Sequence, residues 1–277
     1  MSTKTRTKKT FSILSSLISF VFVIFLPVFF SCVSAPISQT DDDFLKPNTT
    51  LWKKFGENSD IEFFTFRNGK IKYHCAKINL QNKKLKILAY PNADSDNQDS
   101  IKFRKFIRHS GAKIAMNTNP YMKSGKIIGV HIADGTKISQ ESKMYSALIF
   151  KEEDEGFSAK IIGTQEEKSL ENAKFAFGGA YAILKNGKEI QFKNTSYDAR
   201  SAAGISADGR TLYLLSAEKY FFKRGLSYQE CAEILKNLGA ADALEFDGGS
   251  STSFFLSGEI RNTEIPRKNP AYMGFSF

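Results

Sequence analysis

The sequence predicts an α+β fold, in which mixed but largely antiparallel sheets pack against two or three helices in a single domain. Short apolar runs separated by Asn-Gly or Asp-Gly turns recur along the chain, which indicates many hairpins. Two segments instead carry apolar residues at helical spacing. The chain has 277 residues, of which 42% are hydrophobic and 25% charged, so it can bury a full core.

Residues 1–31 have the pattern of an export signal. A basic stretch through Lys9 precedes an apolar run from Phe11 to Phe30, and Cys32 follows. This pattern resembles a bacterial lipoprotein leader, with Cys32 as the lipidated residue. The alternative is an uncleaved membrane anchor, because the run approaches the roughly 20 apolar residues that a spanning helix needs. In either form we expect the domain in the cell envelope, tethered to the membrane and facing the periplasm or the exterior.

Residues 32–50 are polar, contain two prolines and lack a sustained period, which predicts a tether. Residues 51–277 then form the folded domain. The formal charge of +10 includes four basic residues of the leader, and from Cys32 onward 35 basic and 29 acidic residues give +6. Because the basic residues are spread along the chain, we expect no nucleic-acid partner and instead an anionic polymer of the envelope.

The domain is predicted to open with a hairpin. Asn68-Gly69 stands between the alternating runs Ile61–Phe66 and Ile71–Leu80, and this is the strongest short hairpin signal. A helix is expected over Ser100–Ser110, because apolar residues recur there at helical spacing and Gly111 follows as a stop. Further strands are expected at Leu85–Tyr90, Ile127–Ile132, Tyr145–Lys151, Ser158–Ile162, Phe175–Tyr181, Ala182–Leu184, Ala199–Ile205, Thr211–Ala217 and Ala271–Phe277.

One strand is expected to have a polar residue at its carboxyl end. Lys113–Met116 reads as a buried strand, and Asn117 follows at its carboxyl end. Regular pairing cannot continue much further, because Pro120 lacks a backbone donor. Asn117 is therefore a candidate for a site residue, or it simply caps a loop through its own backbone.

The segment that organises the domain begins with a capped helix. Ser227 and Glu230 form the capping-box pattern, and Gly239 stands where a left-handed residue would end the helix. The apolar stripe consists of Cys231, Ile234, Leu235 and Leu238.

A strand over Ala243–Asp247 is expected next. Leu244 and Phe246 alternate with Glu245 and Asp247, so a strand would bury the apolar pair and set the two carboxylates side by side on its other face. Two glycines and three hydroxyl residues follow, and they form a concavity suited to phosphate or sugar oxygens. These residues are Gly248, Gly249, Ser250, Ser251 and Thr252.

Together these blocks resemble the phosphodiester glycosidase family. The most specific block is the capped helix, the strand and Asp247-Gly248-Gly249-Ser250-Ser251-Thr252. Three supporting blocks fit the family's order, namely Ala115-Met116-Asn117, Phe177-Gly178-Gly179 and Ala199–Ile205. The chain departs from the family at Glu245, where Asn is usual, and at Ser250, where a third glycine often occurs.

The resemblance implies hydrolysis of the bond between the anomeric carbon of a sugar and a phosphodiester. Asp247 is then the candidate base or nucleophile and Glu245 the second carboxylate, while Arg200 would hold the phosphate bidentately. Asn117 would bind a sugar hydroxyl or orient water. The substrate-binding set is completed by Gly178, Gly179, Gly248, Gly249, Ser250, Ser251 and Thr252.

No cofactor or metal is expected for this chemistry. The three histidines, His74, His109 and His131, lie apart in the sequence, and no Cys-x-x-Cys pair occurs. The alternative function is a non-catalytic envelope lipoprotein that binds anionic glycans with the same cleft. Geometry distinguishes the two functions: a carboxylate exposed in a shared pocket favours the enzyme, whereas carboxylates locked inward in ion pairs favour binding.

Overall fold

The computed structural model describes residues 44–277, apart from residues 57–59, 96–98, 194–195, 257 and 262–266. They belong to one compact unit. The predicted export segment and Cys32 lie outside the described residues. Within the described part of the chain, no helix has the length and apolar character needed to cross a membrane.

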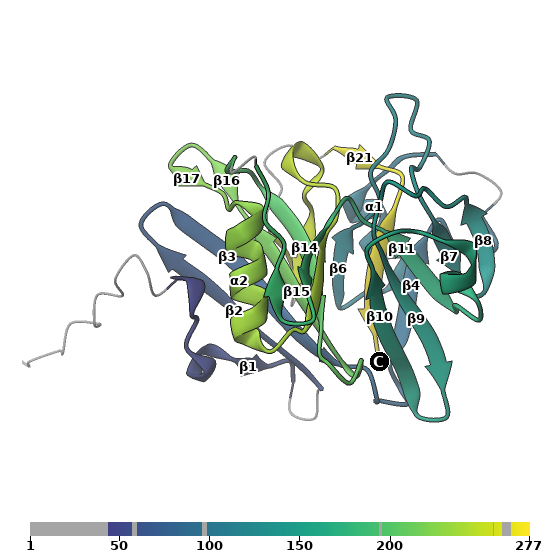
Figure 1. The fold of residues 1–277 in the computed structure, drawn as a ribbon, viewed down its shortest axis with the longest axis horizontal. Helices are drawn as coiled ribbons and strands as arrows, with labels where there is room; N and C mark the ends of the chain where they lie inside the picture. The colour runs from purple at the N-terminus through teal and green to yellow at the C-terminus, as the bar shows by residue number, and fades with distance from the viewer. Residues whose placement is uncertain (1–43, 57–59, 96–98, 194–195, 257, 262–266) are drawn as a thin grey trace, which may run out of the picture. The chain divides into compact units, whose positions relative to one another are not determined.

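Three antiparallel sheets make up most of the fold (Figure 1). Sheet I has eight strands in the order β1 (Lys53–Lys54), β2 (Ile61–Asn68), β3 (Ile71–Asn79), β15 (Thr211–Ala217), β14 (Arg200–Ile205), β18 (Asp242–Glu245), β12 (Ala182–Lys185) and β13 (Lys188–Glu189). Sheet II has five strands in the order β20 (Glu259–Arg261), β19 (Phe254–Leu256), β6 (Ile114–Asn117), β22 (Tyr272–Ser276) and β4 (Lys86–Tyr90).

Sheet III and two small ladders complete the strands. Sheet III has five strands in the order β10 (Gly156–Ile162), β9 (Ala147–Glu153), β11 (Phe175–Gly178), β7 (His131–Ala133) and β8 (Thr136–Ser139). The ladders pair β16 (Lys219–Tyr220) with β17 (Lys223–Arg224), and β21 (Lys268–Asn269) with β5 (Ile101–Lys102). Short 3-10 turns are η2 (Thr49–Leu51), η3 (Glu167–Leu170) and η4 (Gly249–Ser251).

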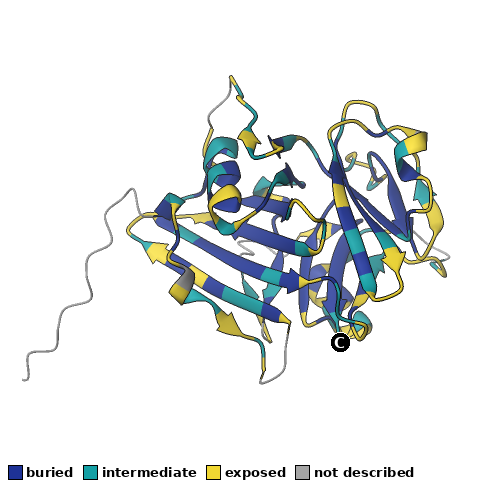
Figure 2. Ribbon diagram, turned by 60° about the horizontal axis from the view of Figure 1, so that its bottom comes forward, coloured by how far each residue is buried: buried dark blue, intermediate teal, exposed yellow. Residues whose placement is uncertain are grey.

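The main core lies between the three sheets. Its buried side chains come from all of them, for example Ile78 of sheet I, Met116 of sheet II and Phe150 of sheet III. Figure 2 shows buried residues running along the strands, whereas loops and strand ends are exposed. Because apolar side chains on facing strands are removed from water together, this burial is the main favourable contribution to folding.

Two helices cover outer faces of the sheets. Helix α1 (Phe103–Ser110) ends at Gly111 with φ 69°, and its buried Phe103 and Phe106 pack on Tyr272 of sheet II. Helix α2 (Tyr228–Leu238) packs on the outer face of sheet I.

The ends of α2 match the sequence prediction. Both hydrogen bonds of the capping box between Ser227 and Glu230 are present, and Gly239 ends the helix in the left-handed conformation. Local signals therefore predicted both ends of α2 and the end of α1, whereas α1 begins at Phe103, three residues later than expected, because Ile101–Lys102 form strand β5.

The predicted fold class is confirmed in its main part. Sheets packed with two helices are observed, but every strand pair in the described ranges is antiparallel, and the sheets dominate. The expectation of an α+β fold with mixed, largely antiparallel sheets is therefore met in its antiparallel part, and the fold is more sheet-dominated than expected. Tight hairpins join some neighbouring strands, such as β2 with β3, and such connections produce only antiparallel pairs, whereas β3 and β15 are antiparallel neighbours far apart in the chain.

The folded body also extends before residue 51. Phe44 is buried, and its carbonyl accepts a hydrogen bond of 2.7 Å from the Tyr73 hydroxyl. The carbonyl of Leu45 accepts another from the Asn237 amide at 2.8 Å. The last residues of the segment predicted to be a tether therefore pack against the domain.

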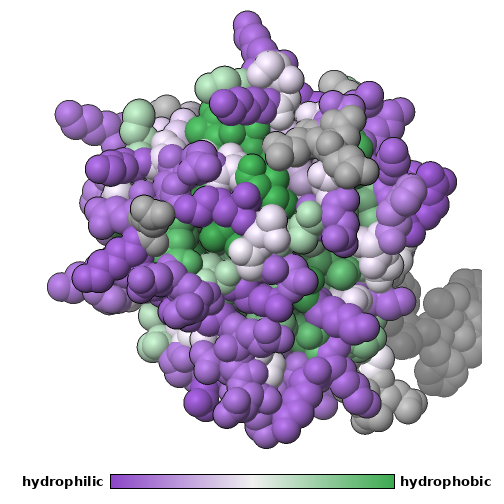
Figure 3. All heavy atoms as spheres, turned by 90° about the vertical axis from the view of Figure 1, so that its right-hand side faces the viewer, coloured by the Kyte–Doolittle hydropathy of each residue, from purple (hydrophilic) through white to green (hydrophobic). Residues whose placement is uncertain are grey.

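The face near β7 and β8 is largely polar. Figure 3 shows that hydrophilic residues cover most of it, and that hydrophobic residues are visible only in gaps between them. Apolar atoms that are exposed between polar side chains are normal on the surface of a folded protein. This view therefore gives no sign of a broad apolar contact surface on this face.

Candidate active site

A cavity of about 410 Å³ opens where the predicted glycine loop meets the end of sheet I. Its walls come from the loop after β6, the start of β14, the start of α2 and the loop after β18. The lining residues are Tyr121, Met122, Lys123, Asp198, Arg200, Tyr228, Asp247, Gly248, Gly249, Ser250, Ser251 and Arg267. The structure thus brings together one predicted cation, one predicted carboxylate and most of the predicted loop.

Asp247 is the predicted carboxylate that faces the cavity. It is half-buried, and its backbone N–H donates a hydrogen bond of 2.9 Å to the Thr118 carbonyl. Burial raises the pKa of its carboxyl, while a hydrogen bond with Ser251 and the charge of Arg267 act in the opposite direction. A carboxylate in a cavity whose pKa is raised by burial is a candidate for proton transfer or for attack on a substrate.

The glycine loop is shaped by backbone hydrogen bonds. Gly249 has φ 58°, and its N–H donates to the Ala199 carbonyl at 2.8 Å, which joins the loop to the residue before Arg200. A Cβ added at Gly248 would lie 3.0 Å from the same carbonyl and 3.3 Å from Oε1 of Glu245. Glycine at these positions therefore allows the loop to approach the start of β14 closely.

Arg200 is a buried cation, and its guanidinium is held in place by two backbone carbonyls and one aromatic ring. Its Nε donates to the Leu226 carbonyl at 2.9 Å, and its Nη2 donates to the Ser196 carbonyl at 2.8 Å. Its guanidinium also lies 4.2 Å from the centre of the Tyr228 ring. These contacts fix the plane of the guanidinium, so it can receive an anion without reorganising.

Glu245 does not share the cavity with Asp247. Strand β18 ends at Glu245, and the side chain of Glu245 is 1% exposed, with Oε1 3.7 Å from Nη1 of Arg200. Neither of its carboxyl oxygens has a hydrogen-bond partner among the described residues. Burial raises its pKa to about 8, although the charge of Arg200 opposes that shift.

The two carboxylates do not lie side by side on one exposed face of the strand as expected, because both faces of β18 are covered. Leu244 and Phe246 are buried in the main core as expected, but helix α2 covers the opposite face of β18. Both faces of the strand are therefore buried, and Glu245 lies behind Arg200. Asp247 lies beyond the strand end, where the chain has turned toward the cavity.

Asn117 connects four segments instead of lining the cavity. Its Nδ2 donates to the Asp247 carbonyl at 2.7 Å, and its Oδ1 accepts from the Ser201 hydroxyl at 2.7 Å and from the Ser253 N–H at 2.9 Å. The amide is 1% exposed. Asn117 therefore fixes the position of the Asp247 loop against β14 and the start of β19, and its predicted contact with substrate stays a prediction.

Three other predicted binding residues lie outside the cavity wall. A Cβ at Gly178 would lie 2.5 Å from Nδ2 of Asn119, and one at Gly179 would lie 2.7 Å from the Glu245 carbonyl. Both glycines thus permit close packing behind the site. Thr252 is buried at the end of the loop.

Several residues of the cavity were missed by the sequence reasoning. Asp198 is half-buried, and its carboxylate accepts from the Ala199 N–H at 2.8 Å. Its position just before Ala199-Arg200 was the signal that could have identified it. Tyr121 and Arg267 have no such local signal, because they reach the cavity only through folding: the Arg267 guanidinium donates to the Ser250 hydroxyl at 2.7 Å and lies 5.5 Å from the Tyr121 ring.

The fold and the sequence blocks around this cavity define the class of protein. A family model described as phosphodiester glycosidase matches residues 110–274, which is more than half of the chain. The chain therefore belongs to the phosphodiester glycosidase family, as the sequence blocks indicated.

Two curated relatives carry the same printed name. The chain is 25% identical over 171 residues to N-acetylglucosamine-1-phosphodiester alpha-N-acetylglucosaminidase of Mus musculus, covering 54% of this chain and 33% of the relative. It is 25% identical over 174 residues to the Bos taurus protein of that name, covering 55% and 33%. The chain thus spans about a third of the length of these relatives.

Solved structures show the same fold. The zebrafish N-acetylglucosamine-1-phosphodiester alpha-N-acetylglucosaminidase catalytic domain, auto-inhibited by its pro-peptide, matches with a TM-score of 0.66 and 16% identity over 80% of this chain and 85% of that chain. A hypothetical protein from Synechocystis matches with a TM-score of 0.62 and 13% identity, covering 78% of this chain and 62% of that one.

Proposed function

We propose that the protein hydrolyses the glycosidic bond of a sugar-1-phosphodiester in a glycan or glycopolymer. The observation that carries this proposal is that Arg200 and Asp247 line one cavity together with the hydroxyl-bearing glycine loop. Cleavage of a bond between an anomeric carbon and a phosphate requires a cation for the departing phosphate and a carboxylate for the sugar, and this cavity contains both kinds of group. Family membership and the names of the relatives support the same reaction class.

Arg200 has the properties required to receive the departing phosphate. Two backbone carbonyls and the Tyr228 ring already hold its guanidinium, so no further ordering is needed on binding. Glu245 lies directly behind it. With a pKa of about 8, Glu245 is mostly protonated at neutral pH, and the charge of Arg200 is then available to the phosphate. Glu245 would in this way tune Arg200 from outside the cavity, which differs from its predicted role as second carboxylate.

Asp247 would act on the sugar side of the bond. Glycoside cleavage passes through an oxocarbenium-like state, which a carboxylate stabilises directly or by activating water. A phosphate is a better leaving group than an alcohol, so the main requirement on the other side is a cation. Asp198 also lines the cavity and is a second carboxylate within the same wall. The hydroxyls of Ser250 and Ser251 can donate to phosphate or sugar oxygens.

The test compares the wild type with Asp247→Asn. Release of free sugar and of the phosphomonoester from a sugar-1-phosphodiester should fall by about a hundredfold or more in the variant, because it can neither accept a proton nor attack. Asp154→Asn, at an exposed position between β9 and β10, is the matched control and should retain the wild-type rate. An unchanged rate for Asp247→Asn would remove Asp247 from the chemistry.

A second function stays open because Arg200 and the loop suit binding as well as cleavage. A non-catalytic envelope lipoprotein would bind an anionic glycan in the same cavity and release no product. Calorimetry with the diester, run beside the product assay, separates the two. Binding with no product from the wild type over a broad panel of sugar-1-phosphodiesters would favour the binding function.

The proposed place of action is the cell envelope. The basic and apolar leader followed by Cys32 supports export and attachment to the membrane. Cys32→Ser should release the protein from the membrane fraction if the cysteine carries lipid. Retention of this variant in the membrane fraction would instead favour an uncleaved anchor.

A further inference from the structure

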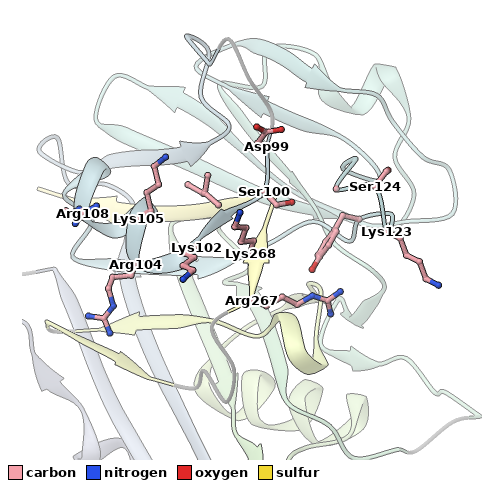
Figure 4. A pocket seen from close by; sticks show the side chains of 13 residues that line it. Asp99, Ser100, Lys102, Arg104, Lys105, Arg108, Lys123, Ser124, Arg267 and Lys268 are labelled. Atoms are coloured by element: carbon pink, nitrogen blue, oxygen red, sulfur yellow. The ribbon is translucent and has the colours of Figure 1, made fainter.

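A second and larger cavity adjoins the candidate active site. Its volume is about 920 Å³, and it is built by β5, the first turns of α1, the loop after β6 and β21. Tyr121, Lys123 and Arg267 line both cavities. Figure 4 looks into this second cavity, which we call the basic channel. A ligand that leaves the active site past the Arg267 side chain therefore enters the basic channel.

The described walls of the basic channel are strongly cationic. They carry seven basic side chains and one carboxylate, that of Asp99. The basic residues are Lys102, Arg104, Lys105, Arg108, Lys123, Arg267 and Lys268. All seven are exposed, and no salt bridge joins any of them to another residue that the structure describes. Some lysines elsewhere on the surface do pair with carboxylates, as Lys236 does with Glu189 at 3.1 Å.

Two features of the channel oppose stability in the free protein. Lys102 and Lys268 are directly opposite each other in the β5–β21 ladder, and like charges at such positions repel. Lys102 is also the N-cap of α1, whose first turn contains Arg104 and Lys105 and no acidic residue. Basic groups at the positive end of a helix are unfavourable. An anion bound in the channel would relieve both repulsions.

We propose that the basic channel binds the anionic repeats of a glycan phosphate polymer next to the diester that is cleaved. This proposal rests on the proposed function, because the polymer must place one sugar-1-phosphodiester beside Arg200 and Asp247. It also specifies the substrate class: a chain of sugars joined by phosphates, and not an isolated diester. Exposed lysines and arginines in an open channel bind successive phosphates without demanding one sugar.

The lining favours a glycan over a nucleic acid. Single-stranded nucleic acids are bound by aromatic side chains on which the bases stack. Among the described residues that line the channel, Tyr121 is the one aromatic residue, and the Arg267 guanidinium lies near its ring. Its hydroxyl is also engaged, with Asn269 at 3.1 Å. A channel with abundant cations and no open stacking surface suits phosphates separated by sugars.

The experiment compares two substrates in the wild type and in two variants. The substrates are a single sugar-1-phosphodiester with a neutral aglycone and an oligomer of the same sugar-phosphate repeat. The test variant is Lys102→Gln/Arg104→Gln/Arg108→Gln, which changes exposed side chains of the channel. The control variant is Lys53→Gln/Lys54→Gln/Lys84→Gln, which removes three exposed charges that line neither cavity.

In the wild type, kcat/KM for the oligomer should exceed that for the single diester. The ratio of the two values should fall about tenfold in the test variant, mainly through KM, because three exposed charge contacts are lost. The ratio should stay at the wild-type value in the control variant. Added salt should reduce the ratio in the wild type more than in the test variant.

Binding is measured separately from cleavage, by fluorescence anisotropy of the labelled oligomer. Equal affinity of the wild type and the test variant for the oligomer would overturn the proposal. So would a single-stranded oligonucleotide that competes better than the glycan oligomer. If the wild type binds the oligomer through the channel but cleaves neither substrate, the proposed hydrolysis is refuted and the proposed binding in the channel is supported. If it cleaves both substrates with equal kcat/KM and the variants do not differ, the proposed binding in the channel is refuted and the proposed hydrolysis is supported.

Discussion

Replacing Glu245 by glutamine should change how the stability of the protein depends on pH. The carboxyl is 1% exposed, and burial raises its pKa from 4.5 to about 8, against the opposing effect of Arg200. Between these values the folded protein keeps a proton that the unfolded chain has lost. The folded state then binds more protons, so the free energy of unfolding falls as pH rises through this window. Glutamine removes the titration while preserving the shape of the side chain.

The size of the effect follows from the two pKa values. Each pH unit between 4.5 and about 8 is worth about 1.4 kcal/mol, so the whole window amounts to about 5 kcal/mol. Between pH 5 and pH 7.5 the change is about 3 kcal/mol. That is a large part of the roughly 5 to 15 kcal/mol by which folded domains are stable.

Urea unfolding of both proteins at several pH values between pH 5 and pH 8 provides the assay. The free energy of unfolding of Glu245→Gln minus that of the wild type should rise by about 3 kcal/mol as the pH rises through most of this range. Other titrating groups, such as His74 with its pKa lowered by burial, are present in both proteins and cancel in the difference. Parallel curves would refute the reasoning, because they would mean that Glu245 is ionised in the folded protein as the partner of Arg200.

Two further substitutions test the packing around the site. Asn117→Ala removes the three hydrogen bonds of the side chain and leaves buried partners unsatisfied, so urea unfolding should show a loss of about 2 to 4 kcal/mol. Hydrolysis should fall too, because Asn117 holds the Asp247 carbonyl; wild-type stability would contradict this account. Gly225→Ala places a Cβ 2.1 Å from the Asp198 carbonyl at φ +76°, and should cost about 2 kcal/mol or more in thermal unfolding. Gly187→Ala is the control, with φ +71° and open space, and an equal loss in both variants would exclude the steric explanation.

The local structure of the domain was largely predictable. The Asn68-Gly69 turn, the Ser227–Glu230 cap and the stop at Gly239 all act within a few residues. Their effects therefore do not depend on the rest of the fold. Most of the glycine loop after Phe246 lines the cavity as the sequence suggested, but its contacts with Ala199 and Asn117 come from distant parts of the chain.

The site itself was only partly predictable. Arg200 and Asp247 were found from sequence blocks, and they meet in one cavity. Asn117 was also found, but its side chain is fully buried in contacts with other segments. Tyr121 and Arg267 were missed, because they are 146 positions apart in the chain and no local pattern marks them.

By itself, the sequence determined the helix ends, the hairpins and the identity of the polar residues that could do chemistry. Alternation of apolar and polar residues cannot tell whether one or both faces of a strand are covered. The packing of α2 on β18 decided that Glu245 is buried behind Arg200 while Asp247 faces the cavity. The tertiary structure also decided that β5, α1 and β21 gather their lysines and arginines beside that cavity, because only long-range packing sets the distance between charges on separate elements.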